Sequence, residues 1–300
     1  MERPAIAIIG AGKVGSALAY ACWRLGYRLA GVASRTAGSA ATLADRIKTN
    51  WSLHAEEITR QADIVFITVP DRYVETVTEQ ITFSGGVVQG QFIYHVSGSL
   101  PVSVLAGAAS CGARIGSMHP LQSFTFTETA WQQFQGAYMA LDGDRKAVAQ
   151  ARELALQLGS IPFSVPGGQR TLYHAAACMA SNYLIALAQC AAQLLKPCGL
   201  NEQQAVMALW PLMKGSMDNL LKVGPAKALS GPISRGDGNT VQRHVAALAT
   251  TDRDTLRLYT ALGHYTLNMA KKQGLLDERL MNELINSLET EMGETINETR

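Results

Sequence analysis

The chain has 300 residues, more than one average domain, and this length predicts two domains. Its 26 basic and 24 acidic side chains leave a net charge of only +2, which excludes a general nucleic-acid or polyanion binder. Hydrophobic residues make up 47% of the chain, which excludes disorder of the whole chain, whereas charged residues make up 17%, below the roughly 25% typical of soluble domains. Either much of the surface is small and neutral, or part of it is buried against a partner.

Short apolar runs alternate with helical patterns through the first half of the chain. Runs of this kind are typical of parallel strands that helices cover on both faces. We expect strands at residues 5–9, 28–33, 62–69, 92–96, 114–118, 137–141 and 161–165, and helices at 14–25 and 145–158. Residues 1–166 are therefore predicted to form an α/β domain with a doubly wound, mostly parallel sheet.

After Pro166-Gly167-Gly168 the pattern becomes helical, so residues 167–300 are predicted to form an all-α domain. Helices are expected at 171–195, 202–222, 240–250, 253–273 and 278–288. The helix at 171–195 contains no Asp, Glu, Lys or Arg and is long enough to span a bilayer. Its polar residues and many alanines favour a buried helix of a soluble protein, and a membrane span is the alternative.

The five cysteines are widely spaced and form no CxxC pair. A disulfide framework or a zinc site is not expected from this spacing, and no other metal site is predicted. The first residues run into only a short apolar stretch before Gly10, which does not fit a signal peptide. We therefore expect the protein in the cytoplasm.

A glycine-rich turn lies between the first expected strand and the first expected helix. It reads Gly10-Ala11-Gly12-Lys13-Val14-Gly15, the GxGxxG pattern of Rossmann domains. The first glycine permits a tight turn, the second lets a pyrophosphate approach the backbone, and the third lets the helix pack on the strand. The helix N-terminus then favours the phosphates. This context predicts a dinucleotide site, and a glycine-rich turn without a ligand is the alternative.

The end of the second strand distinguishes NAD from NADP. A carboxylate there would bind the ribose 2′-hydroxyl of NAD, but this chain has Ser34-Arg35-Thr36. A guanidinium with flanking hydroxyls suits a 2′-phosphate, so NADP(H) is predicted, with a solvated arginine as the alternative. Val69-Pro70-Asp71 ends a later strand and is expected to border the cofactor, although Asp71 alone would also serve as a helix cap.

Hydride transfer to a carbonyl or imine needs a proton donor, and His119 is the best candidate among six histidines. It ends the 114–118 strand and should lie at the edge of the sheet where ligands bind. Ser97 and Ser99 end the neighbouring strand at that edge and are expected to orient substrate or to complete a proton relay. The alternative is that His119 only ends a strand and that the serines only shape a turn.

Two further groups of polar residues lie in the helical half. His174, Cys178, Ser181 and Asn182 lie along one side of the uncharged helix, where they contact either a ligand or another helix. The glycine-rich segment 229–244 contains Arg235, and Asp237, Asn239 or Thr240 is expected to cap the helix that follows. Arg235 and that helix N-terminus are predicted to bind a substrate carboxylate, and a plain interhelical loop is the alternative.

At these residues the chain resembles Rossmann-like reductases of the 6-phosphogluconate and 3-hydroxyacid dehydrogenase superfamily. More narrowly, it resembles the bacterial family that joins a Rossmann-like domain to a helical domain of unknown function. The matching segments are Gly10–Gly15, His95–Ser99, His119–Phe124, Tyr173–Asn182 and Gly231–Asp237. The resemblance implies an NADP(H)-linked reductase whose helical domains exchange to form a homodimer, and we place Gln122, in the third segment, among the substrate contacts.

The resemblance also bears on the chemistry. His119-Pro120 is similar to the His-Pro of prephenate dehydrogenases, whose histidine contacts substrate, and Ser97 falls near their catalytic serine. Asn182 matches an asparagine of the 3-hydroxyacid dehydrogenases, but their catalytic lysine is replaced here by Cys178. That departure favours His119 as the catalytic residue, with assistance from His174.

The residues and the resemblance together predict an NADP(H)-dependent reductase for a small carboxylate-bearing carbonyl compound. The resemblance makes an oxo acid such as 2-dehydropantoate the first candidate. An imine reductase similar to pyrroline-5-carboxylate reductase, and an NADP-binding module without turnover, are the alternatives. The low charge is explained if the 171–195 helix runs through a core shared by two chains.

Overall fold

The computed structural model describes residues 3–289. The chain divides into two compact units, Met1–Leu184 and Ile185–Arg300. The division falls 18 residues after the predicted boundary between 166 and 167. The difference arises because the first turns of the helix after Gly168 still bind the first unit through Arg170 and Tyr173.

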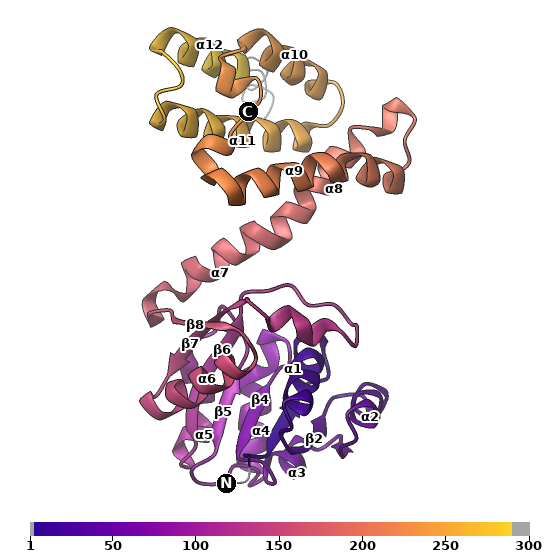
Figure 1. The fold of residues 1–300 in the computed structure, drawn as a ribbon, viewed down its shortest axis with the longest axis vertical. Helices are drawn as coiled ribbons and strands as arrows, with labels where there is room; N and C mark the ends of the chain where they lie inside the picture. Colours follow the sequence, from indigo (N-terminus) through magenta and orange to yellow (C-terminus); the bar gives the residue numbers. More distant parts are fainter. Residues whose placement is uncertain (1–2, 290–300) are drawn as a thin grey trace, which may run out of the picture. The chain divides into compact units, whose positions relative to one another are not determined.

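The first unit is built on one eight-stranded sheet (Figure 1). Its strands are β1 (Ile6–Ile9), β2 (Leu29–Ala33), β3 (Trp51–Ser52), β4 (Ile64–Ile67), β5 (Phe92–His95), β6 (Arg114–Pro120), β7 (Tyr138–Gly143) and β8 (Ile161–Ser164). The order is β3-β2-β1-β4-β5-β6-β7-β8, and every pair is parallel except β6 with β7. The predicted doubly wound, mostly parallel sheet is confirmed, and each predicted run forms a strand. The pattern missed only β3, which is two residues long and half exposed.

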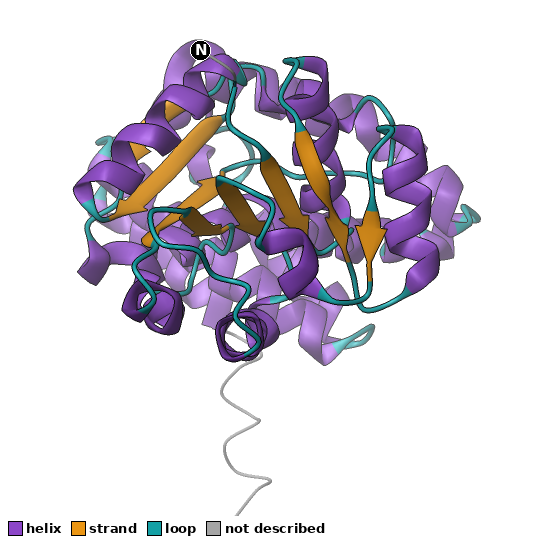
Figure 2. Ribbon diagram, turned by 90° about the horizontal axis from the view of Figure 1, so that it is seen from below, coloured by secondary structure: helices purple, strands orange, loops and turns teal. Residues whose placement is uncertain are grey.

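Helices cover both faces of this sheet, as Figure 2 shows. They are α1 (Lys13–Arg24), α2 (Ala37–Arg46), α3 (Ala55–Thr59), α4 (Val74–Phe83), α5 (Ala106–Ser110) and α6 (Arg145–Gln157), with 3-10 turns η1 (Asp71–Tyr73), η2 (Val102–Leu105), η3 (Ala130–Phe134) and η4 (Gly167–Gln169). Side chains alternate along a strand, so Ile6 and Ile8 pack with α1, α2 and α6, whereas Ala7 and Ile9 pack with α3, α4 and α5. This two-sided burial explains why the strands are continuous apolar runs.

The uncharged residues 171–195 lie mainly in three consecutive helical elements. These are α7 (Arg170–Cys178), a π-helical turn η5 (Met179–Tyr183) and α8 (Leu184–Gln193). The prediction of a buried helix is wrong for the single chain. Only 6% of its most apolar stretch is buried, and Leu172 and Ile185 are 70% and 69% exposed. By length and composition alone, the continuous helix Arg170–Cys198 is sufficient to cross a membrane.

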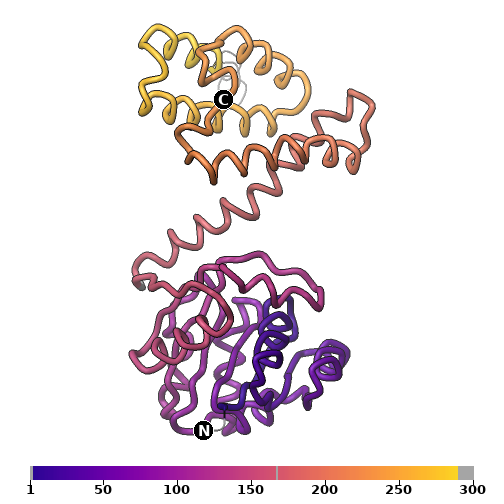
Figure 3. Tube along the Cα trace, viewed as in Figure 1, coloured from indigo at the N-terminus to yellow at the C-terminus, as the bar shows by residue number. Residues whose placement is uncertain are grey.

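The second unit is helical over its described residues. After η6 (Lys196–Cys198) it contains α9 (Glu202–Ala228), η7 (Ile233–Arg235), α10 (Gly238–Ala249), α11 (Arg253–Lys272) and α12 (Glu278–Glu289), which Figure 3 traces from orange to yellow. A reciprocal cap between Asn201 and Gln204 begins α9, and a kink at Gly224 (φ +77°), just before Pro225, interrupts it. The core lies among α10, α11 and α12, where Val241 and Leu284 are fully buried. The predicted all-α second part is confirmed.

Candidate active site

The glycine-rich turn after β1 has the geometry that a bound phosphate requires. Gly10 has φ +116°, a conformation that side chains rarely adopt, and a Cβ at Gly15 would overlap the carbonyl oxygen of Gly10. By contrast, no atom lies within 4 Å of the position that a Cβ on Gly12 would occupy. The turn is therefore closely packed at its ends and open at Gly12, at the N-terminus of α1.

A groove of about 660 Å³ runs from this turn across the ends of β2 and β4 to α4. Of the predicted cofactor residues, those that line it are Gly10, Ala11, Gly12, Ser34, Arg35, Thr36, Val69 and Pro70. Lys13 does not line it, and its ammonium group lies over the ring of Phe126. Val14 and Gly15 belong to α1, and Asp71 faces a neighbouring group of residues.

That neighbouring group, the serine–aspartate cluster, consists of Asp71, Ser97 and Ser99. The carboxyl ends of the parallel strands β4 and β5 lie side by side, which brings these residues together. Oδ2 of Asp71 accepts hydrogen bonds from the hydroxyl of Ser97 at 2.7 Å and from that of Ser99 at 2.8 Å. Asp71 does not act as the helix cap that the sequence left open, because no side-chain hydrogen bond caps α4.

The Ser97 hydroxyl has no remaining hydrogen-bonding capacity. It donates to Asp71 and accepts from the backbone N–H groups of Ser99 and Leu100, each at 3.1 Å. A hydroxyl has one donor and two acceptor sites, so Ser97 is saturated and shapes the turn. Ser99 donates to Asp71 and keeps acceptor capacity, which makes it the better placed of the two to meet a ligand.

His119 lies at the end of β6, beside α7. Its Nδ1 is 2.6 Å from the hydroxyl oxygen of Tyr173, and its ring lies 6.4 Å from that of His174, centroid to centroid. Burial, followed by the nearby charges of His174 and Arg170, lowers the pKa of His119 to about 4, and burial raises the pKa of Tyr173 to about 12. At neutral pH the imidazole is therefore neutral and the tyrosine retains its proton.

Gly98 keeps space for the two histidine rings. A Cβ on Gly98 would lie 2.8 Å from Cε1 of His119 and 2.8 Å from Cδ2 of His174. Both distances are shorter than real Cβ contacts, so any side chain at this position would displace a ring. The sequence Ser97-Gly98-Ser99 therefore places two hydroxyls beside Asp71 and a bare backbone against the imidazoles.

Arg170, the first residue of α7, joins this helix to the sheet. It is 2% exposed, and its guanidinium donates to the Ser97 carbonyl oxygen and to the Ser117 hydroxyl, each at 2.8 Å. Asp142 on β7 balances the charge at 3.5 Å. The sequence did not single out Arg170 or Tyr173 as site residues. The only sequence signal for either residue was its position. Arg170 is the last charged residue before the uncharged residues 171–195, and Tyr173 directly precedes His174 in the sequence.

Other predicted residues lie outside this group. Nδ1 of His174 contacts Sγ of Cys178 at 3.8 Å, whereas Ser181 and Asn182 are exposed within the π-helical turn η5. Gln122 is exposed in the β6–β7 connection, where it accepts a hydrogen bond from the backbone of Ser123.

The predicted carboxylate-binding residues belong to the second unit. Asp237 caps α10 as expected, accepting from the backbone N–H of Thr240 at 3.0 Å, and hydrogen bonding to the side chain and then to the backbone of Thr240 lowers the pKa of its carboxyl. Arg235 is exposed at the end of η7. Their roles toward a substrate stay predictions.

Family models match two parts of the chain. Residues 1–120 match a model described as a Rossmann-like domain, and residues 137–266 match the domain of unknown function DUF2520. The chain belongs to the proteins that join a Rossmann-like domain to a DUF2520 domain. The site draws on both matches: Asp71, Ser97 and His119 lie in the Rossmann-like part, whereas Arg170 and Tyr173 lie in the DUF2520 part.

Solved structures share this fold. A proposed NADP oxidoreductase from Bacteroides fragilis is 25% identical, with a TM-score of 0.75 over 89% of this chain and 98% of its own. A Thermotoga maritima protein is 24% identical, with a TM-score of 0.70 over 89% of this chain and 99% of its own. A 1-pyrroline-5-carboxylate reductase from Streptococcus pyogenes is 16% identical, with a TM-score of 0.57 over 95% of this chain and 99% of its own. No curated protein sequence matches the chain.

Proposed function

We propose that the protein is an NADP(H)-dependent reductase that acts on a small carboxylate-bearing carbonyl compound, an oxo acid such as 2-dehydropantoate. The observation that carries the proposal is the presence of the groove at the glycine-rich turn, here called the dinucleotide groove, and of the hydrogen-bonded His119–Tyr173 pair at the carboxyl ends of strands of one sheet. The Bacteroides fragilis structure, described as an NADP oxidoreductase, supports the reductase class.

The groove fits the phosphates of NADP. The open position at Gly12 lets a pyrophosphate lie against the N-terminus of α1, and Arg35 with the hydroxyls of Ser34 and Thr36 suits a 2′-phosphate. NADPH, when bound, supplies the hydride. We assign the edge at Val69 and Pro70 to the cofactor as well, because both residues line the same groove.

The chain's own residues supply the proton. In the resting state, neutral His119 accepts a hydrogen bond at Nδ1 from the Tyr173 hydroxyl and carries its own proton on Nε2. As the substrate oxygen gains negative charge, it takes the Nε2 proton while Nδ1 takes the proton of Tyr173, so that the imidazole ends neutral. The guanidinium of Arg170 stabilises the tyrosinate, which then regains a proton from solvent.

The remaining roles follow from position. Arg170 and Asp71 hold the turn at residues 97–99, and the Ser99 hydroxyl accepts a hydrogen bond from the substrate. His174 assists His119 by holding its pKa low. We retain Asn182 as a proposed catalytic residue and Gln122, Arg235, Asp237 and Thr240 as proposed substrate contacts, with Arg235 and the start of α10 binding the carboxylate.

Imine reduction is the second candidate, and Asp71 is the observation that favours it. An exposed carboxylate beside the site would stabilise a positively charged iminium carbon–nitrogen group, and it would not stabilise a neutral carbonyl in this way. The Streptococcus pyogenes protein, named as a 1-pyrroline-5-carboxylate reductase, has the same fold.

The test is NADPH oxidation, followed at its absorbance maximum, with matched panels of oxo acids and cyclic imines. Turnover of an oxo acid with kcat/KM well above that of every imine supports the first proposal. Turnover of imines alone replaces it with the second. NADPH binding by fluorescence titration without turnover of any compound would show a nucleotide-binding module instead.

We also propose a cytoplasmic homodimer formed through the helical unit. Large apolar side chains are exposed along α8 and α9, among them Met207, Leu212 and Leu221 at 69%, 68% and 91%. A face of this kind supports burial against a second copy of the chain. All five cysteines are free, as a reducing compartment requires. Sedimentation in detergent-free buffer should give the mass of two chains, and a monomer, or extraction only with detergent, would contradict the proposal.

A further inference from the structure

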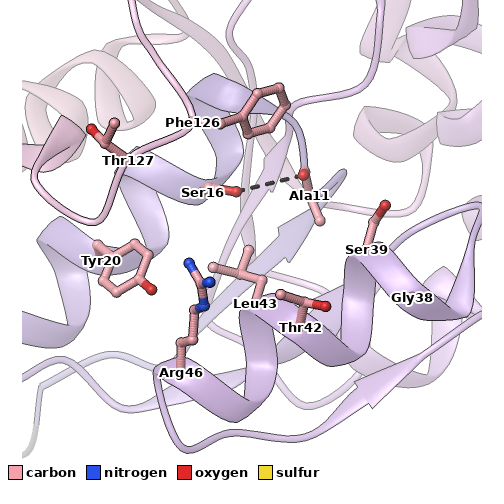
Figure 4. Close-up of a pocket in the computed structure, with 10 residues that line it drawn as sticks. All are labelled: Ala11, Ser16, Tyr20, Gly38, Ser39, Thr42, Leu43, Arg46, Phe126 and Thr127. Carbon is pink, nitrogen blue, oxygen red and sulfur yellow. Dashed lines mark hydrogen bonds between the residues drawn. The ribbon is translucent and has the colours of Figure 1, made fainter.

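A second pocket lies in the first unit between α1 and α2. It has a volume of about 360 Å³, and the 121–129 connection covers part of it with Phe126 and Thr127 (Figure 4). Ala11, Ser39 and Phe126 line both this pocket and the dinucleotide groove, so the two spaces adjoin. None of the residues at its far end, Tyr20, Thr42 and Arg46, lines the dinucleotide groove.

An unpaired buried hydroxyl lies in this pocket. Tyr20 is only 8% exposed, and its hydroxyl has no hydrogen-bond partner among the described residues. Figure 4 shows that hydroxyl turned toward the guanidinium of Arg46, with Thr42 on the same helix as Arg46. A buried polar group without a partner costs free energy, so a ligand oxygen here would be favoured.

An acidic side chain already pairs with Arg46. Nη1 of Arg46 lies 3.4 Å from the carboxylate of Glu128, in the connection that covers the pocket. The two side chains are 50% and 67% exposed, and exposed ion pairs of this kind are weak, so an incoming anion can replace Glu128. Glu128 therefore competes with an incoming anion for the guanidinium of Arg46.

We propose that this pocket binds a compact phosphate-type oxyanion, either free or as the phosphate of a small metabolite, between Arg46 and Tyr20. Arg46 supplies the charge, and Tyr20 and Thr42 supply hydroxyl donors. Binding releases Glu128 and, with it, the connection that carries Phe126. Because Phe126 also lines the dinucleotide groove, the anion alters the affinity for NADPH. The inference concerns a separate site and does not depend on turnover.

The test is isothermal titration of the full chain with inorganic phosphate and, in a second arm, with glycerol 3-phosphate. Arg46→Gln should weaken phosphate binding by about tenfold or more, and Tyr20→Phe should weaken it by a smaller factor. Glu128→Gln should strengthen it, because the competing carboxylate is gone. Arg257→Gln, which breaks a similar exposed ion pair with Asp254 in the second unit, serves as the matched control and should change nothing. Tighter binding of glycerol 3-phosphate indicates a phosphorylated metabolite, and equal binding indicates the free anion.

Three results would overturn the proposal. One is the absence of saturable binding, and another is binding that Arg46→Gln leaves unchanged. The third is phosphate binding that competes directly with NADPH binding and is lost in Arg35→Gln. The anion would then occupy the 2′-phosphate position of the groove. Circular dichroism of each variant checks folding. The proposed function is judged separately, from NADPH turnover in phosphate-free buffer.

Discussion

The proposed dinucleotide groove and the His119 cluster are built in different ways, although Asp71 of the cluster directly follows Pro70 of the groove. The His119 cluster consists of Asp71, Ser97, Ser99, His119, Arg170 and Tyr173. The predicted cofactor residues line the groove in two short stretches, 10–12 and 34–36, each in one strand-to-helix turn, and at Val69 and Pro70. The cluster draws on separate segments: η1, the turn after β5, the end of β6 and the start of α7. Local backbone geometry therefore determines the groove, whereas buried polar contacts between distant segments hold the cluster. Substitutions in the cluster should disturb catalysis and leave NADPH binding intact, and the reverse should hold in the groove.

The largest effect is expected for His119→Ala. Loss of the positioned proton donor should lower kcat/KM by about 10²- to 10⁴-fold while the Kd for NADPH stays within twofold to threefold, roughly the scatter of surface changes. Steady-state kinetics and fluorescence titration measure the two quantities. A kcat/KM within a few-fold of wild type would remove His119 from the mechanism.

Gly98→Ala should have the next largest effect. The added methyl would lie 2.8 Å from both histidine rings, so we expect kcat to fall by roughly 10- to 100-fold because His119 is displaced. Gly107→Ala is the matched control, because the nearest atom to its Cβ is 3.6 Å away. Equal kinetics for the two variants would show that the rings tolerate movement.

Arg35→Gln tests the groove. Removal of a charge-assisted contact to the 2′-phosphate should reduce the preference for NADPH over NADH by about 10- to 100-fold. Arg152→Gln, an exposed arginine on α6, is the control. An unchanged ratio of kcat/KM values for the two cofactors would place the specificity elsewhere.

Tyr173→Phe should lower kcat by about tenfold, since His119 keeps its ring but loses the proton that replaces the one it donates. Tyr138→Phe, which alters a half-exposed tyrosine on β7, should leave kcat unchanged. If Tyr173→Phe has full activity, the hydroxyl only orients the imidazole in the resting enzyme.

The smallest effect concerns stability and pH. The pKa of His119 is about 4 in the folded chain and about 6.5 in the unfolded chain, so between these values only the unfolded chain binds the proton. The free energy of unfolding should therefore decrease as the pH falls from 6.5 to about 4. His119→Gln should reduce this slope, measured by urea unfolding at several pH values. Part of the slope should remain, because burial also lowers the pKa of His95 to about 4. An unaltered slope in His119→Gln would contradict the lowered pKa.

How far the sequence predicted the fold and the site depended on the kind of residue. Strands β1, β2, β4 and β5 were predictable because burial on both faces makes them largely apolar runs. His119 and Ser97 lie where the sequence placed them, at the ends of recognisable strands, whereas Asp71, expected to border the cofactor, accepts hydrogen bonds from Ser97 and Ser99 instead. Arg170 and Tyr173 were missed, since nothing in a helical pattern shows which of its polar residues turns back to the sheet. The uncharged helix was misjudged for a related reason: an apolar sequence calls for burial but does not say against what.

The sequence by itself determined the succession of strands and helices along the chain, the glycine-rich turn after β1 and the basic residue after β2. These features depend on hydrophobic periodicity and on the backbone freedom of glycine, which act over a few residues. Only the tertiary structure decided that Asp71 faces two serines, that Ser97 is saturated, and that His119 pairs with Tyr173. Hydrogen bonds between segments as far apart as residues 97 and 170, and the burial that lowers the pKa of His119, exist only once the chain is folded.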